Sequence, residues 1–150
     1  MIGNGDLNGI TIAGGMYIKP GDSYSISVTD LLYNKLTGFN KGKESNVIVD
    51  GSAGTFTVEI DGTYKFAGIA SVAPSAGMFL KFGVYINNIF QEKIEACLDF
   101  KNSQDTNTFA GTGFLDLKAG DVVDIRGKSD TQPVTLGICN MNIEIHRIGH

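Results

Sequence analysis

The sequence predicts a single all-β domain in which two antiparallel sheets form a sandwich. Glycine accounts for 20 of the 150 residues and charged residues for only 19%, which is typical of a turn-rich β protein. Short apolar alternations recur with turn signals about every 8–12 residues, and no ten-residue stretch has the periodicity of a helix. This spacing favours a sandwich or barrel over alternating strands and helices.

The first 40 residues are glycine-rich and contain two short predicted strands, Met16–Ile18 and Tyr24–Val28. In the second of these, apolar residues occupy every other position, as in a half-buried strand. Residues Leu31–Leu36 are expected to form one helical turn. We interpret residues 1–40 as a glycine-rich arm or a set of extra strands, and residues 41–150 as the main β domain.

The main domain contains most of the predicted strands. Asp50-Gly51, Asp61-Gly62 and Asn87-Asn88 are turn signals between apolar runs, and the polar stretch Lys101–Asn107 is expected to be an exposed loop. The predicted strands are Val47–Val49, Thr55–Ile60, Tyr64–Val72, Phe79–Ile86, Phe90–Phe100, Phe109–Leu117, Val122–Arg126 and Val134–Ile148.

Charge and hydropathy exclude two classes of partner. The formal net charge is −4 and the basic residues are scattered, whereas nucleic-acid binding generally needs a basic patch. No window approaches 18 consecutive apolar residues, so membrane insertion is not expected. The N-terminus also lacks the pattern of a signal peptide, so we expect synthesis in a cytoplasm without export.

Catalytic and metal-binding patterns are weak, so we expect no enzyme, no cofactor and no metal. The two histidines, His146 and His150, come without a Gly-x-Ser-x-Gly elbow or a metal-ligand spacing. Asp121, Asp124 and Asp130 crowd one region where a Ca²⁺ site is an alternative, but turn carboxylates explain them better.

Two further residue types are assigned to packing. Cys97 and Cys139 each lie in an apolar run, and we expect buried free thiols. Core packing is also favoured over a ligand groove for four aromatic residues. These are Phe39, Phe79, Phe90 and Phe109.

Three segments resemble a known family. Phe56, Gly62, Tyr64 and Phe66 have the spacing of the signature of the C1q/TNF-like jelly roll, although Gly68 stands where that family usually has another aromatic residue. The run from Leu115 through Leu117 to Gly120, Asp121 and Val123 is similar to the family's late turn and strand, and Leu136-Gly137-Ile138 to its last core strand. The resemblance covers about residues 45–148, and we expect the phage or bacterial type.

The resemblance implies a jelly-roll sandwich for residues 41–150 and assembly as a homotrimer. Its implied core positions are Phe56, Gly62, Tyr64, Phe66, Leu117, Gly120 and Asp121. If Tyr64 and Phe66 face the core, the opposite side of that strand carries candidate trimer contacts, because strand side chains alternate. The candidate contacts are Ala67 and Ile69 there, with Cys139, Met141 and Ile143 on the final strand.

The function expected from this reasoning is structural. A jelly roll without a collagen-like Gly-x-y repeat resembles those of bacteriophage particles, which indicates a trimeric head fibre, decoration or tail-associated protein of a virion. Residues 1–40 would attach it to other virion proteins. The alternative is a carbohydrate- or receptor-binding module, an adhesin or host-recognition tip. In that alternative the loops at 74–77 or 101–107 would contact a host surface glycan.

Overall fold

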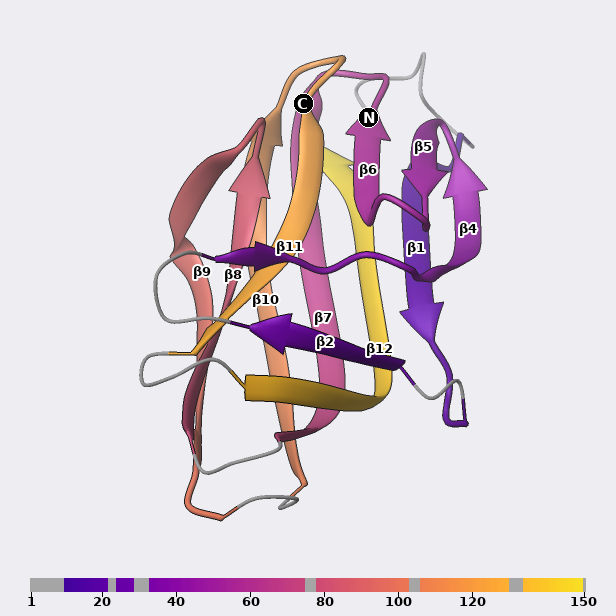
Figure 1. Cartoon of the computed structure of the whole chain (residues 1–150). Coiled ribbons are helices and arrows are strands. Elements are labelled where there is room, and N and C mark those ends of the chain that lie inside the picture. Colours follow the sequence, from indigo (N-terminus) through magenta and orange to yellow (C-terminus); the bar gives the residue numbers. More distant parts are fainter. Residues whose placement is uncertain are drawn as a thin grey trace.

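Two antiparallel sheets pack face to face in the computed structural model (Figure 1). The structure describes residues 10–21, 24–28, 33–74, 78–102, 106–129 and 134–149. The first sheet has the strand order β10-β7-β12-β1-β4, with β2 also paired to β12. The second has the order β5-β6-β11-β8-β9, with β3 also paired to β11. The prediction of an all-β sandwich of two antiparallel sheets is therefore confirmed.

The strands vary from two to sixteen residues in length. In chain order they are β1 (Ala13–Ile18), β2 (Tyr24–Val28), β3 (Asn34–Lys35), β4 (Asn40–Ser45), β5 (Val47–Asp50), β6 (Thr55–Val58), β7 (Gly62–Pro74), β8 (Met78–Ile86), β9 (Ile89–Phe100), β10 (Asn107–Leu117), β11 (Val122–Ser129) and β12 (Val134–Gly149). Among the described residues, no helix is long and apolar enough to cross a membrane.

The core lies between the two sheets and follows from strict alternation along the strands. In β7 the side chains of Tyr64, Phe66, Ala70 and Val72 are buried, while the residues that alternate with the buried ones face outward. Phe82 of the second sheet stacks on Phe109 of the first, with ring centroids 4.4 Å apart. Such interdigitation of the two inner faces is how sandwiches bury their apolar surface.

The predicted turns form with the backbone conformations that their residues favour. Asn87 and Asn88 have φ of 50° and 67°, the left-handed values that a two-residue hairpin turn needs. At Gly120, φ is 96°, and the Asp121 carboxylate accepts a hydrogen bond from the Lys118 N–H at 2.8 Å. The Asn87 side chain donates to Asp121 at 2.9 Å, so the two turns are held together at one end of the sandwich.

The segment from 13 to 18 is built into the first sheet. β1 pairs with β12 on one side and with β4 on the other (Figure 1). Met16 and Ile18 are buried in the common core. This part of the predicted 1–40 region is therefore an interior strand, while residues 1–9 lie outside the described residues.

The helical turn predicted at Leu31–Leu36 is wrong over its described part. Asn34 and Lys35 form β3 and lie opposite Gly127 and Arg126 of β11. The Leu36 N–H donates to the Ile125 carbonyl at 3.0 Å. Pairing with an adjacent strand and burial of Leu36 therefore outweigh the weak local helical pattern.

Candidate self-association face

The outer surface of the first sheet is the candidate site, and the register of its strands defines it. Ala110 of β10 lies opposite Ile69 of β7, which lies opposite Asn142 of β12. Asn142 in turn lies opposite Tyr17 of β1. Because directly opposed residues of an antiparallel pair project from the same side, these four side chains form a row across the sheet.

A second row runs parallel to the first. Thr112 lies opposite Ala67, Ala67 opposite Glu144, and Glu144 opposite Gly15. The two rows together are called the self-association face below. Six of its eight side chains are apolar, small or both, and Glu144 is the single charged residue among them.

A hollow of about 390 Å³ opens on this face. Its lining residues are Ala67, Gly68, Ile69, Ala110, Gly111, Thr112, Asn142 and Glu144. The hollow exists because alanine and glycine leave space that larger side chains around them do not fill. Ile69 and, in the next row, Phe114 are 50% and 57% exposed, so large apolar side chains stand beside an unfilled depression.

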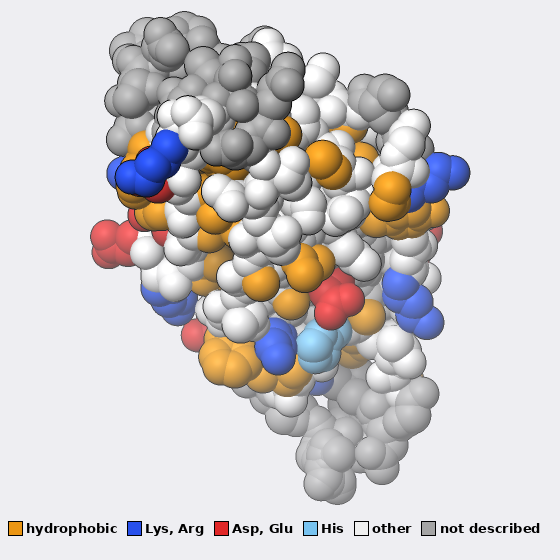
Figure 2. All heavy atoms as spheres, turned by 90° about the horizontal axis from the view of Figure 1, so that it is seen from below, with side chains coloured by type: hydrophobic (Ala, Val, Ile, Leu, Met, Phe, Trp, Pro, Cys, Tyr) orange, Lys and Arg blue, Asp and Glu red, His pale blue; other side chains and the backbone are white. Residues whose placement is uncertain are grey.

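The next row differs in charge. Phe114 lies opposite Lys65, and Lys65 lies opposite His146. Seen from below, a red, a pale-blue and a blue side chain stand next to one another among orange and white atoms (Figure 2). By register, Glu144 is the one charged residue of the two rows, and Lys65 adds charge in the next row.

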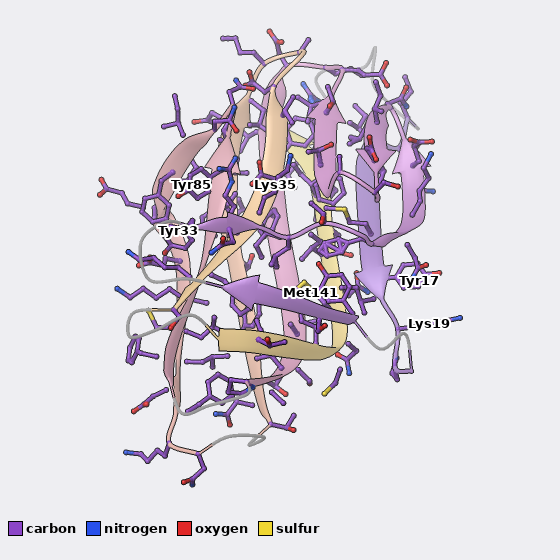
Figure 3. All side chains as sticks on the ribbon, viewed as in Figure 1. Tyr17, Lys19, Tyr33, Lys35, Tyr85 and Met141 are labelled. Atoms are coloured by element: carbon purple, nitrogen blue, oxygen red, sulfur yellow. The ribbon has the colours of Figure 1, made fainter. Side chains whose placement is uncertain are left out.

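Ala67 and Ile69 lie on the outer surface as the alternation predicts, but the assignment of two other candidates is corrected. Met141 and Ile143 are 1% and 0% exposed and face the core. Figure 3 shows Met141 between the sheets, whereas Tyr17 points outward. The cause is a register shift between Ile138 and Asn140, which inserts one extra residue and reverses the facing of everything after it.

Cys139 occupies this bulge and is exposed, as is Cys97. The prediction that both thiols are buried is therefore wrong. The outward residues of β12 beyond the bulge are Asn142 and Glu144, which the sequence reasoning missed together with Ala110 and Thr112 of β10. Counting alternate positions from the buried Phe109 would have identified the β10 residues; no sequence signal marks the bulge.

The large side chains of the family motif are buried, whereas Gly120 and Asp121 lie in a turn. Phe56, Tyr64, Phe66 and Leu117 are buried, and the Tyr64 hydroxyl donates to the Ile60 carbonyl at 2.7 Å. Burial raises the pKa of the Tyr64 phenol. A Cβ at Gly62 would lie 2.5 Å from the carbonyl oxygen of Gly149, so only glycine fits there.

The described part of the chain holds no cluster of metal-ligating side chains. No three His, Cys, Asp or Glu residues there lie close enough together to hold a metal ion. Asp121 binds turn groups and Asp124 binds Arg126, at 2.7 Å between Oδ1 and Nε. His150 and Asp130 lie outside the described residues. Of the four aromatics assigned to packing, Phe39 and Phe109 are buried and Phe79 and Phe90 are half-buried.

Solved structures with the same arrangement identify the fold. The Eiger TNF of S. frugiperda superimposes with a TM-score of 0.71 at 12% identity, covering 93% of this chain and 94% of that one. The chain has the C1q/TNF-like jelly-roll fold. The globular domain of zebrafish complement 1qA gives a TM-score of 0.60 at 20% identity, covering 89% and 94%. Murine APRIL at pH 5.0 gives 0.60 at 9% identity, covering 91% and 99%.

By sequence, no family model and no curated protein matches the chain. At these identities the structural likeness establishes the fold alone. Function must therefore be argued from the surfaces of this chain.

Proposed function

We propose that this chain is a non-enzymatic structural or binding module that assembles as a homotrimer through the self-association face. The observation that carries the proposal is the hollow bounded by Ile69, Ala67 and Ala110, in which exposed apolar side chains surround unfilled space. Interface centres are depleted in charge, and Glu144 is the single charged residue in the two rows of this face. A threefold arrangement is what the family resemblance implies.

A second copy is the occupant that suits this surface. Phe114, at its margin, is a large side chain of the kind that fills a hollow in a partner, and each copy carries both the side chain and the hollow. An assembly in which one copy's edge fills the next copy's hollow is heterologous, and three copies close it into a ring. Closure would leave no hollow exposed.

At a finer level, we propose that the trimer is a structural component of a bacteriophage virion, such as a head fibre, a decoration or a tail-associated protein. Support comes from a jelly roll with no collagen-like repeat in its 150 residues. Attachment would use residues before β1, because β1 itself is an interior strand of the sheet. Deleting residues 1–9 should abolish binding to particles and leave the trimer intact; retention of the shortened protein on particles would contradict this attachment.

A second candidate is a glycan- or receptor-binding module. One observation favours it: aromatic and cationic side chains cluster on the outer face of the other sheet, around Tyr33, Tyr85 and Arg126. That cluster faces away from the self-association face, so binding there and assembly are compatible.

The assembly is tested with two isoleucines of equal exposure. Ile69 lies on the self-association face and Ile48 on β5 of the other sheet, and each is 50% exposed. We expect Ile69→Glu to convert the trimer to monomers, because a charge would be buried at an apolar contact, while Ile48→Glu leaves the trimer unchanged. Light scattering after size exclusion measures both masses. A trimer that survives Ile69→Glu would place the interface elsewhere.

A further inference from the structure

Four cationic side chains are arranged as a group on the outer face of the second sheet. Arg126 and Lys128 lie two residues apart on β11 and therefore project from the same face. Lys35 of β3 lies opposite Arg126, and Lys81 of β8 lies opposite Lys128. These four residues, each half-buried, are called the basic grid.

The register of the grid places like charges directly opposite one another in two neighbouring pairs. Such pairs destabilise a sheet. Asp124 neutralises Arg126, with a distance of 3.0 Å from Oδ2 to Nη2 besides the Nε contact. Among the described residues, no ion pair involves Lys35, Lys81 or Lys128. The chain as a whole carries −4, so the grid concentrates positive charge against the overall balance.

Aromatic rings contact two residues of the grid, Arg126 and Lys128. Tyr33 stacks on Phe90 with centroids 5.4 Å apart and meets the ring of Tyr85 edge-on at 5.6 Å. The Arg126 guanidinium carbon lies 4.0 Å from the Tyr85 centroid, and the Lys128 ammonium lies 5.7 Å from that of Tyr33. Figure 3 shows Tyr33 and Tyr85 together beside β8.

Gly83 makes this arrangement possible. It lies on β8 opposite Arg126, and a Cβ there would come within 2.7 Å of Phe90 Cε1. The Tyr33 hydroxyl donates a hydrogen bond to Glu95. Burial is the main cause that raises the pKa of the Tyr33 phenol, and this hydrogen bond raises it further. The Tyr33 phenol therefore stays protonated, and its hydrogen bond to Glu95 fixes the position of the ring.

The same contacts decide which ligand fits. One face of Tyr85 is covered by Arg126 and one face of Tyr33 by Phe90, so these two faces are closed to a neutral sugar. The cations, in contrast, are pre-positioned. Their Cα atoms are spaced by ~4.8 Å across strands and ~6.7 Å along β11, which suits two or more anionic groups on one ligand.

We propose that the basic grid binds an oligoanion, a ligand carrying at least two closely spaced sulfate or phosphate groups. A sulfated oligosaccharide and a polyphosphate chain share this chemistry. An anion lying over the grid would relieve the repulsion within both like-charge pairs, and charge-assisted hydrogen bonds from lysine and arginine would hold it. Binding does not depend on trimer formation, because the grid lies on the other sheet.

The test is isothermal titration of the full chain with a heparin-derived hexasaccharide and with tripolyphosphate. We expect at least one probe to bind, with an affinity that falls as NaCl is raised from low to physiological concentration. The variant Lys81→Gln/Lys128→Gln should lose about tenfold in affinity or more. The matched control Lys101→Gln/Lys118→Gln removes two exposed lysines outside the grid and should bind like the wild type.

Thermal unfolding keeps the test independent of folding defects. The Lys81→Gln/Lys128→Gln variant lacks one like-charge pair. Without added probe, its thermal unfolding midpoint should therefore equal or exceed that of the wild type. Saturating probe should raise the midpoint of the wild type and of the control by more than that of this variant. Binding of only one probe identifies the ligand class as sulfated oligosaccharide or polyphosphate. Binding of both probes means that the spacing of the charges alone determines recognition. Absence of binding to both probes at low salt, or equal loss in the control, would overturn the proposal.

Discussion

The two sheets share one core but present outer faces of opposite character. On the first sheet, Ala67, Ala110 and Thr112 leave a hollow, and Glu144 is the only charged residue of its two central rows. On the second, Tyr33 and Arg126 belong to a crowded layer of rings and cations. The inner faces follow one rule, apolar alternation, and therefore specify the fold. The outer faces are free of that rule, so their differences carry the functional information.

The largest loss of stability should come from β12, in which the bulge reverses the direction of the side chains that follow it. Met141 is buried and Cys139, two residues earlier, is exposed. Met141→Ala should lower the free energy of unfolding by about 2–5 kcal/mol, because it leaves a core cavity. Cys139→Ala should change it by less than ~0.5 kcal/mol. Urea unfolding measures both, and equal effects would mean that the two residues share a face.

Breaking the ion pair between Asp124 and Arg126 should lower the free energy of unfolding by somewhat less. Asp124 is 3% exposed and Arg126 is stacked on Tyr85. Arg126→Met would leave a buried carboxylate without its partner, and we expect a loss of about 3 kcal/mol in the free energy of unfolding. Arg126→Lys keeps the charge but not the two-pronged contact, so it should recover only part of this. Full stability of Arg126→Met would show that the pair is not structural.

Two strand glycines differ in the space that surrounds them. Gly83→Ala would push Phe90 aside and should destabilise by about 1–3 kcal/mol, while also weakening oligoanion binding. At Gly111 of β10, nothing lies within 4 Å of an added Cβ. Gly111→Ala should therefore be neutral or stabilising by up to ~1 kcal/mol. Differential scanning calorimetry compares the two, and a neutral Gly83→Ala would contradict the described ring packing.

The smallest effect is expected at the edge of the first sheet and depends on pH. The Val49 N–H donates to Glu44 at 2.9 Å and Lys41 lies 3.2 Å away, and these contacts lower the pKa of Glu44. Because the pKa is lower in the folded state, the contribution to stability is present at neutral pH and is lost as pH falls through the acidic range. Glu44→Ala should lower the unfolding midpoint slightly at pH 7 and not at pH 3. The exposed Glu59 provides the control, since Glu59→Ala should show no such pH-dependent difference.

Much of the fold was predictable because local alternation and turn residues determine it. Tyr64 and Phe66 alternate with outward residues as expected, and Asn87-Asn88 forms the predicted turn. Strand β4 could not be predicted, because Asn40–Ser45 contains no large apolar residue and depends on its pairing with β1. Its lysines suit an exposed edge strand, since charge discourages further pairing.

The surfaces were predictable only in part. Ala67 and Ile69 followed from the facing of Tyr64, but the bulge at Cys139 has no local signal and moved Met141 and Ile143 into the core. The basic grid was hidden for a different reason. Its residues come from β3, β8 and β11, which are distant in sequence, and only strand register brings them together.

The most direct test of the account is the mass of the wild-type chain in solution, measured by light scattering after size exclusion at micromolar concentration. The chain has a mass of 16.0 kDa, and assembly through the self-association face predicts about 48 kDa, three times that value. A stable monomer of one chain mass would contradict the account, because the hollow and its apolar margin would then remain exposed without a second copy to cover them.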